Sequence, residues 1–232
     1  MKISVAMAAY NGESFILEQL ASILNQLSAE DEVVISVDPS EDNTMNVLTA
    51  LSGEEPRIKL IEGEGKGLIK NFENALNNCT GDVIFLSDQD DKWLDDKVST
   101  VMKHFDNGAD LVLHNCIVAD GMLREKADKT FFELHGSKKG VKENIIKNSY
   151  MGCCMAFRKE IIDMALPFPE DIPMHDQWLG LIAERCGANV IFEEKPLLLY
   201  RRHGGNASST EHAGILTMIK CRINITKNLR KG

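Results

Sequence analysis

The sequence predicts an α/β domain, built on a mostly parallel sheet with helices on both sides. Over residues 2–88, short apolar runs alternate with segments whose apolar residues recur at helical spacing. Parallel strands need a crossover segment, usually a helix, so this alternation is typical of parallel sheets. The chain has 232 residues, of which 44% are hydrophobic, and no repeat or linker divides it. That length and composition can bury one sizeable core.

The first half of the chain contains the clearest elements. In 13–27 the apolar residues fall on one helical face, and 31–38 is β-branched and ends at Asp38. Polar turn residues separate the segments, as expected at strand and helix ends. The expected strands are 2–8, 31–38, 57–63 and 82–88, and the expected helices are 13–27, 41–51 and 68–79.

The pattern loosens after about residue 110. A strand is expected over 109–121, followed by a polar loop with weak helices over 122–148. Residues 150–165 begin as a strand and end as a helix, and 175–187 form a helix that Gly187 stops. The segments "ANVIFEE" and "PLLLYRRH" predict two further strands.

Composition and charge exclude several classes of protein. The formal net charge of −9 argues against broad nucleic-acid binding, which needs a basic face. None of the six cysteines forms a C-x-x-C pair, so we expect reduced thiols in a cytosolic protein. The N-terminal apolar run is too short for a signal peptide, and no stretch approaches the roughly 20 apolar residues of a membrane span. We therefore expect a cytoplasmic protein.

The C-terminal segment 211–232 predicts a basic amphipathic helix. It mixes Ile, Leu and Met with Lys and Arg. Two interpretations stay open. The helix could dock on the core with its charges in solvent, or it could attach the protein peripherally to an anionic membrane surface at the inner face of the plasma membrane.

Three acids stand at the end of the strand expected over 82–88. In "VIFLSDQDDKW" these are Asp88, Asp90 and Asp91. Carboxylates that gather at a strand end repel one another, and Mg²⁺ or Mn²⁺ removes that penalty while binding phosphate oxygens of a substrate. Helix capping is the competing interpretation, because Asp91 precedes a segment of helical character. Capping explains one acid and leaves two unexplained.

Polar residues follow other strands of the expected sheet as well. Residues 9–11 follow the first strand and residues 38–42 follow the second. Ligands of open α/β sheets bind beyond the carboxyl ends of the strands, so these residues and the acids at 88–91 should converge. Asp38 could be a turn residue with Ser40 or Asp42 capping the next helix, or it could accept hydrogen bonds from a pyrimidine base. This segment alone does not decide between the two.

Several of these segments together resemble a known family. "AAYNGESFILEQLASI", "VDPSEDNT", "GLIKNFENAL…GDVIFLSDQDDKW" and "HDQWL" resemble family 2 of the inverting glycosyltransferases, which have the GT-A fold. The D-x-S-x-D-x-T pattern begins at Asp38, and the D-x-D motif is Asp88, Gln89 and Asp90. "YRRHGGN" is similar to a segment of the bacterial rhamnosyltransferase branch. The resemblance runs from residue 3 to about 206.

The resemblance implies a domain organisation and a set of donor contacts. Residues 1–210 would form one GT-A domain, with 1–110 binding the nucleotide sugar and 111–210 binding the acceptor. Asp38 would read the base and Ser40 would lie beside it, while Lys66 and Asn71 would contact ribose or diphosphate. The remaining residues implied in donor binding are Ala9, Tyr10, Asn11, Glu13, Asp88, Gln89 and Arg201, and those implied at the metal are Asp88, Asp90, Asp91 and His203.

The resemblance also places the catalytic base at Asp176 in "PMHDQWL". An inverting transfer needs a carboxylate that takes the proton of the acceptor hydroxyl. The competing interpretation is that Asp176 only caps a helix, with His175 as its neighbour. Relatives can carry Glu before this Asp, and the His found here leaves the helper group undecided. For Arg201 and His203, the competing interpretation is a glycine-rich surface turn with a basic rim.

The expected activity is therefore an inverting sugar transfer from a UDP- or dTDP-sugar to a saccharide or lipid-linked saccharide acceptor. The expected cofactor is Mg²⁺ or Mn²⁺, and the expected setting is bacterial cell-surface polysaccharide biosynthesis. Two rivals stay open. One is a non-catalytic protein that binds nucleotide sugars. The other is a nucleotidyltransferase. Such an enzyme would usually have a glycine-rich, basic phosphate loop near its first strand, and "AAYNGES" contains no Lys or Arg.

Overall fold

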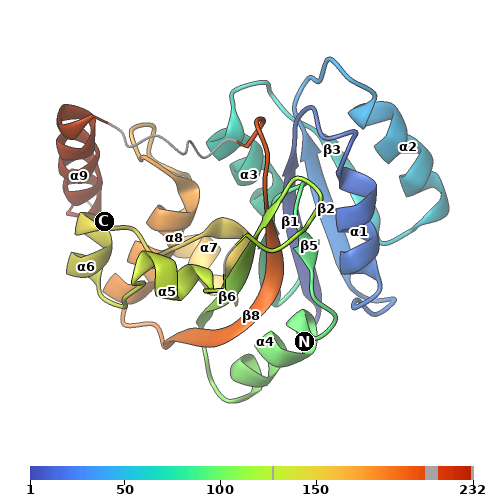
Figure 1. The fold of residues 1–232 in the computed structure, drawn as a ribbon. Helices are drawn as coiled ribbons and strands as arrows, with labels where there is room; N and C mark the ends of the chain where they lie inside the picture. The colour runs from blue at the N-terminus through green and yellow to red at the C-terminus, as the bar shows by residue number, and fades with distance from the viewer. Residues whose placement is uncertain (127, 207–213, 231–232) are drawn as a thin grey trace.

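A computed structural model describes residues 1–126, 128–206 and 214–230. Within these residues the chain forms one eight-stranded sheet in the order β3-β2-β1-β4-β7-β6-β8-β5, with helices around it (Figure 1). The strands are β1 (Ile3–Ala9), β2 (Glu32–Val37), β3 (Ile58–Glu62), β4 (Val83–Ser87), β5 (Lys92–Trp93), β6 (Leu111–Asp120), β7 (Met155–Arg158) and β8 (Val190–Arg202). The helices are α1 (Ile16–Leu24), α2 (Thr44–Glu54), α3 (Leu68–Asn77), α4 (Lys97–Asp106), α5 (Phe131–His135), α6 (Val141–Ile146), α7 (Glu160–Ala165), α8 (His175–Arg185) and α9 (Ile215–Leu229).

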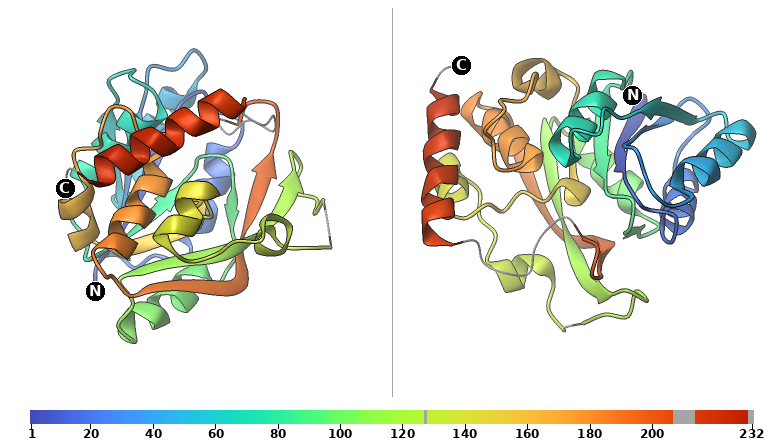
Figure 2. Two further views of the ribbon diagram at one scale, coloured as in Figure 1. Left: turned by 90° about the vertical axis from the view of Figure 1, so that its left-hand side faces the viewer. Right: turned by 90° about the horizontal axis from the view of Figure 1, so that it is seen from above.

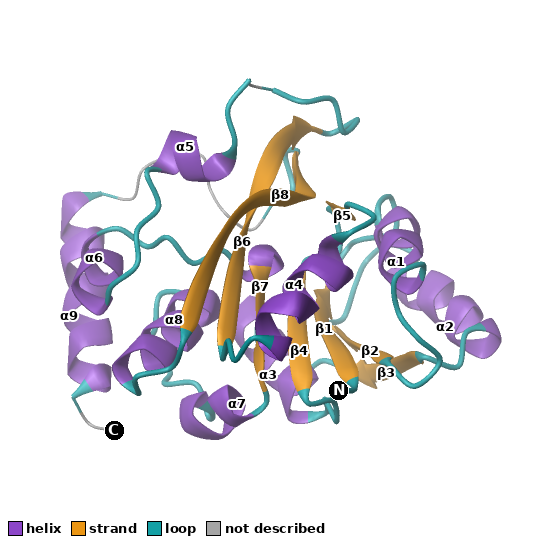
Figure 3. Ribbon diagram, turned by 90° about the horizontal axis from the view of Figure 1, so that it is seen from below, coloured by secondary structure: helices purple, strands orange, loops and turns teal. Residues whose placement is uncertain are grey.

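Four parallel strands form the first half of the sheet, as the alternating pattern predicts. β1 lies between β2 and β4, and β3 pairs with β2. All seven residues of β1 are buried, because helices cover both faces of the sheet at this point. The carboxyl ends of β1, β2 and β4 therefore lie side by side and feed their loops into one region (Figure 3).

The second half departs from the parallel pattern. β7 runs antiparallel to both β4 and β6, and the long β6–β8 pair is parallel and curves away from β1–β4 (Figure 3). A short 3₁₀ turn over Gly152–Cys154 replaces the beginning of the strand expected at 150. In the expected polar loop, α5 and α6 are indeed short helices.

Two expectations about local structure are wrong. Asp91 does not cap a helix: the next residues form β5, which pairs with β8, and α4 begins only at Lys97. β8 is one strand where two were expected. Its pairing with β6 slips in register around Asn115, and this irregularity lets a single strand span both apolar runs.

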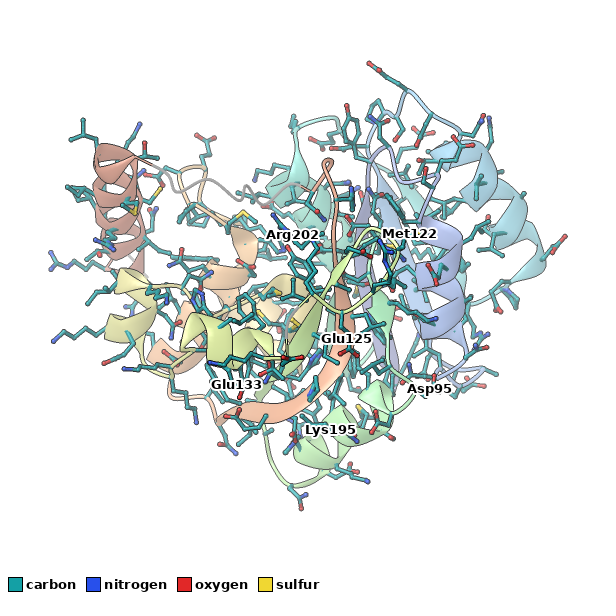
Figure 4. All side chains as sticks on the ribbon, in the orientation of Figure 1. Asp95, Met122, Glu125, Glu133, Lys195 and Arg202 are labelled. Carbon is teal, nitrogen blue, oxygen red and sulfur yellow. The ribbon has the colours of Figure 1, made fainter. Side chains whose placement is uncertain are left out.

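Several charged side chains lie on the outside of the fold. Glu133 and Lys195 project away from the core (Figure 4), and Lys195 pairs with Asp96. α9 lies at the edge of the molecule beside α6 (Figure 2), where Arg222 donates to the carbonyl of Ile146 at 2.7 Å. In the described ranges, no helix is both long and apolar enough to cross a membrane. All six cysteines are free thiols.

Candidate active site

A cavity of about 540 Å³ opens at the carboxyl ends of β1, β2 and β4. Loops after these strands form one side, and the 3₁₀ turn, the start of α8 and the end of β8 form the other. The described residues that line it are Ala8, Ala9, Tyr10, Asp38, Pro39, Gly65, Gly67, Leu68, Asn71, Asp88, Gln89, Asp90, Met151, Gly152, Met174, His175, Asp176, Tyr200, Gly205 and Asn206.

Asp38 and Asn71 place hydrogen-bond acceptors together in this cavity. Asp38 follows β2 directly, and its Oδ1 accepts from the main-chain N–H of Gly65 at 3.0 Å. Asn71, in the first turn of α3, donates to the Ala9 carbonyl, while its Oδ1 is buried without a partner in the described structure. Gly63 has no room for a side chain, because a Cβ there would collide with the Asp38 carboxylate. A ligand that offers an N–H would satisfy these acceptors.

Gln89 ties the loop after β4 to the loop after β1. Its side-chain amide donates to the Tyr10 carbonyl at 2.7 Å and accepts from the Tyr10 N–H at 2.9 Å. The two bonds fix both residues as parts of one wall. Tyr10 keeps an exposed ring at the rim of the cavity.

Asn11, Glu13 and Ser40 join the two donor-side loops behind this wall. Asn11 has a positive φ of 48°, and its Oδ1 accepts from the Glu41 N–H at 2.8 Å. Ser40 Oγ accepts from the Asn11 N–H at 3.1 Å, and Glu13 accepts from the Asn43 N–H at 3.0 Å. These three residues, which were predicted as donor contacts, therefore hold the two loops in position and do not line the cavity. Asn43 is the N-cap residue of α2, and Asp42 Oδ1 accepts from the N–H of Thr44, the first residue of that helix, at 3.0 Å.

The acids after β4 face three different environments. Asp88 lines the cavity, and burial, followed by repulsion from Asp90 and Asp176, raises its pKa to about 7. Asp91 is fully buried behind it, and burial together with the Asp88 charge raises its pKa well above the usual range. Oδ2 of Asp91 has no partner among the described groups. One oxygen each of Asp88 and Asp91 and the Cys153 sulfur lie within 4.8 Å of one another.

Asp90 is held from behind by the segment after β8. His203 Nε2 lies 2.7 Å from Asp90 Oδ2, and the Asn206 amide donates to the same oxygen at 3.1 Å. The His203 ring packs on Phe15, with 4.5 Å between ring centroids. His203 therefore lies where it orients a carboxylate of the cavity wall.

Arg201 and Lys66 lie outside the cavity lining of the described structure. Arg201 is buried: Nε donates to the Asp90 carbonyl, Nη1 to the Gly121 carbonyl and Nη2 to the Glu18 carboxylate. Its N–H also donates to Asp91 Oδ1 at 2.9 Å, so this residue supports the acid loop. Lys66 is exposed and pairs with Glu64. The structure thus does not bring these two predicted donor contacts to the cavity.

Asp176 stands in the first turn of α8 and faces the cavity. Met174 and not Asp176 is the N-cap residue of this helix, although Asp176 does accept from one N–H of the first turn, that of Gln177. Its Oδ2 accepts from the Gly152 N–H at 3.0 Å and its Oδ1 from the Gln177 N–H at 2.6 Å. Burial raises its pKa to about 6. This carboxylate is fixed in place and can exchange a proton near neutral pH.

His175, next to Asp176, has both ring nitrogens buried and unpaired within the described structure. The ring stacks on Phe72 with 4.1 Å between centroids, and burial lowers its pKa to about 3, so it is neutral. A Cβ on Gly152 would lie 3.2 Å from its Nε2. The sequence indicated a His-Asp pair here, and the stacking and burial of the histidine come from contacts with α3.

Several lining residues were not predicted. Met151, Met174 and Tyr200 are apolar or aromatic residues inside strand-like or loop segments, and their pattern does not distinguish a cavity wall from a core. Asn206 was visible in "YRRHGGN", whose resemblance to a known segment was the available signal. Gly65 and Gly67 have positive φ values, and "GEGKG" marks that turn.

Comparison with known proteins finds glycosyltransferases. The family model described as glycosyl transferase family 2 matches residues 4–164. The dTDP-rhamnosyl transferase RfbG of Shigella flexneri is 29% identical over 223 residues, covering 86% of this chain and 72% of that protein. A GalNAc(5)-diNAcBac-PP-undecaprenol beta-1,3-glucosyltransferase of Campylobacter jejuni is 30% identical over 119 residues, covering 50% of this chain and 38% of that protein.

Solved structures match the fold. TarS 1-349 of S. aureus, in complex with UDP-GlcNAc, aligns with a TM-score of 0.77 at 20% identity, covering 99% of this chain and 66% of that one. The mannosyltransferase PcManGT from Pyrobaculum calidifontis, in complex with GDP-Man and Mn²⁺, aligns with a TM-score of 0.66 at 20% identity, covering 88% and 58%. The predicted GT-A fold is thereby confirmed. Since the family model covers more than half of its residues, the chain belongs to glycosyl transferase family 2.

Proposed function

We propose that the protein transfers a sugar from a pyrimidine nucleoside diphosphate to an acceptor hydroxyl, with inversion at the anomeric carbon. The observation that carries this proposal is that one cavity is lined by Asp38, Asp88 and Asp176, which come from three separate segments. The first can recognise a base, the second a charged diphosphate through a cation, and the third can remove a proton.

The acceptors around Asp38 support a uracil or thymine base. Both bases carry an N–H between two carbonyls, and a carboxylate oxygen is a strong acceptor for it. The unpaired Oδ1 of Asn71 offers a second acceptor in the same cavity. The names of two similar proteins fit this class, since RfbG is described as a dTDP-rhamnosyl transferase and TarS was solved with UDP-GlcNAc.

The acids after β4 fit a divalent cation. Asp88 and Asp90 line the cavity. The raised pKa of Asp88 reflects burial first and then repulsion from Asp90 and Asp176, and a cation would relieve that repulsion. Asp88 and Asp90 would hold Mg²⁺ or Mn²⁺ together with diphosphate oxygens, while Asp91 and His203 support them from behind. When bound, the ion would neutralise the charge of the leaving diphosphate. A Mn²⁺ complex of PcManGT is consistent with this role.

Asp176 is the proposed general base. The N–H groups of Gly152 and Gln177 fix its carboxylate at the cavity, and a pKa of about 6 keeps it largely ionised at neutral pH. It would take the proton of the acceptor hydroxyl as that oxygen attacks the anomeric carbon on the face opposite the diphosphate. The neutral His175 beside it adds no charge to the site.

The acceptor is proposed to be a saccharide or lipid-linked saccharide of a bacterial surface polysaccharide. The support is the naming of similar proteins, one of which is a PP-undecaprenol glucosyltransferase. The competing account is a protein that binds nucleotide sugars without turning them over.

The test is nucleotide release from UDP-glucose, UDP-GlcNAc and dTDP-rhamnose with Mn²⁺, in the wild type and in Asp176→Asn. We expect one donor to be turned over, and the variant to bind that donor with unchanged Kd while turnover falls by about 10²- to 10⁴-fold. Asp163→Asn, on the exposed face of α7, is the matched control and should keep full turnover.

The possible results distinguish a glycosyltransferase from a protein that only binds nucleotide sugars. Full turnover in Asp176→Asn would contradict the assignment of the base. Donor binding without turnover in the wild type, in the presence and absence of saccharide acceptors, would favour the binding protein.

A further inference from the structure

The last described helix, α9, has apolar side chains on two opposite faces. Its inner face buries Ile225 and Leu229 against the core. On the outer face the exposed fractions are 83% for Leu216, 45% for Ile219 and 60% for Ile223. These three residues are three and four positions apart, so they form one stripe along the helix. Packing on the core explains the inner residues and leaves the outer stripe without a partner in the described structure.

The same outer face carries positive charge. Lys220, Lys227 and Arg230 are exposed and fall on the stripe side of the helix, since they are four or seven residues from its members. Residues 214–232 contain five Lys and Arg and no Asp or Glu, whereas the whole chain has a net charge of −9. This segment therefore has a positive net charge in an acidic protein, and three of its cations lie beside the exposed apolar stripe.

We propose that the outer face of α9 binds the surface of a bilayer that contains anionic lipids. Leu216, Ile219 and Ile223 would enter the interface, and Lys220, Lys227 and Arg230 would lie among the headgroups. Long basic side chains can reach the headgroups while their stems cover apolar surface. This surface lies apart from the cavity, so the inference does not depend on the proposed function.

The charge pattern favours a lipid surface over a second copy of the chain. In a two-fold dimer through α9, the same face of each copy would meet, and the three cations of one helix would approach those of the other. An anionic bilayer presents the opposite sign across the whole stripe.

The placement of α9 leaves this face accessible. The helix lies across the outside of the molecule, with no described element beyond it (Figure 2). It begins at the same end of the molecule as the carboxyl end of β1 (Figure 1), beside which β4 runs in parallel. A bilayer along its outer face would therefore lie beside the end of the fold that carries the cavity.

The test is sedimentation of the full chain with vesicles of phosphatidylcholine alone and of phosphatidylcholine mixed with phosphatidylglycerol. We expect binding to the anionic vesicles only, weakening as salt screens the charges. Replacing Lys220, Lys227 and Arg230 together by Gln should lower the partition coefficient by roughly 100-fold, at about fivefold per charge. Leu216→Ser with Ile219→Ser and Ile223→Ser should also abolish stable binding.

The test includes matched control substitutions and a measurement of the oligomeric state in solution. Lys59→Gln, Lys103→Gln and Lys129→Gln together remove three exposed cations from other parts of the chain and should leave anionic-vesicle binding within about twofold. Donor turnover without vesicles should be unchanged in every α9 variant, so failure of this inference and failure of the proposed function remain distinguishable. Equal sedimentation with and without anionic vesicles would overturn the inference. So would light scattering that shows a dimer disrupted by the Leu216, Ile219 and Ile223 changes.

Discussion

The Gln89 side-chain amide pairs with the main chain of Tyr10 through two hydrogen bonds, at 2.7 and 2.9 Å. Gln89 follows β4 and Tyr10 follows β1, so this pair joins two loops that lie at the ends of adjacent parallel strands. The donor side of the cavity keeps its shape through this contact, because each loop holds the other. Gln89, the middle residue of the D-x-D motif, therefore has a structural role.

Removing that amide should loosen the donor wall. Gln89→Ala loses both bonds, at about 1 kcal/mol each, and frees the Tyr10 main chain. We expect the KM for the donor to rise by about tenfold and the free energy of unfolding to fall by about 1–2 kcal/mol. Steady-state kinetics and urea unfolding measure both. An unchanged KM would show that the pair does not shape the donor site.

The rate of transfer should depend on the ionisation of Asp176. Burial raises the pKa of this carboxyl to about 6, and only its ionised form can act as a base. We expect kcat/KM, which reports the ionisation of the free enzyme, to rise with pH and to level off above a midpoint near that value. A pH–rate profile of the wild type tests this, and a profile flat across that range would contradict the role of Asp176.

The same shift has a consequence for stability. The folded state binds the Asp176 proton more tightly than the unfolded state, whose carboxyl has a pKa near 3.8. Ionisation therefore disfavours the fold, and stability falls as pH rises from about 4 to about 6, by on the order of 3 kcal/mol. Relative to Asp176→Asn in EDTA, the wild type should lose Tm across this window. A constant difference in Tm would contradict the raised pKa.

His203 should control metal affinity through Asp90. Its Nε2 lies 2.7 Å from Asp90 Oδ2 and orients that carboxylate. His203→Ala should raise the Mn²⁺ concentration needed for half-maximal turnover by about 10- to 100-fold. His104→Ala, which removes a histidine that hydrogen-bonds to Glu193 and does not line the cavity, is the control. Equal Mn²⁺ dependence in His203→Ala and the control would contradict the assignment.

Gly152 should be required for turnover. A Cβ there would lie 3.2 Å from His175 Nε2, which is a tight contact, and 3.6 Å from the Asp176 Cβ, which is an ordinary van der Waals contact. Relief of the first contact would move His175 and with it the adjacent Asp176. Gly152→Ala should displace Asp176 and lower kcat by about tenfold or more, with a smaller effect on donor KM. Gly53→Ala on α2 meets open space and should keep wild-type kcat. Equal kcat in the two variants would show that the base tolerates the shift.

The sequence predicted the donor half of the fold best. The strands expected at 31–38, 57–63 and 82–88 each contain the observed strand, and the strand expected at 2–8 misses only the last residue of β1, Ala9. β1, β2 and β4 are buried on both faces and therefore appear as apolar runs. The convergence of Asp38 and Asp88 follows from parallel pairing alone. These inferences needed only local pattern and one topological rule.

The rest of the fold and of the cavity depends on contacts between distant segments, which the local pattern of apolar and polar residues does not reveal. β5 is two residues long and exists only because β8 pairs with it. Tyr200 lines the cavity, whereas the Arg201 side chain is buried against the Asp90 carbonyl and Glu18, because successive residues of a strand point to opposite sides. The segment "YRRH" does not reveal which of the two faces inward. Asp176 was indicated by resemblance, and its raised pKa follows from burial that no local segment predicts.

The most direct test of the account is thermal unfolding with UDP, dTDP and GDP, each with Mn²⁺ and with EDTA, in the wild type and in Asp38→Ala. The account predicts that UDP or dTDP raises the Tm of the wild type only with Mn²⁺, by an amount equivalent to about 2.7 kcal/mol at a hundredfold excess over Kd. GDP should give a smaller shift, and Asp38→Ala should lose the pyrimidine effect. No shift with any nucleotide, or equal shifts in Asp38→Ala and in EDTA, would contradict a metal-assisted pyrimidine nucleotide site in this cavity.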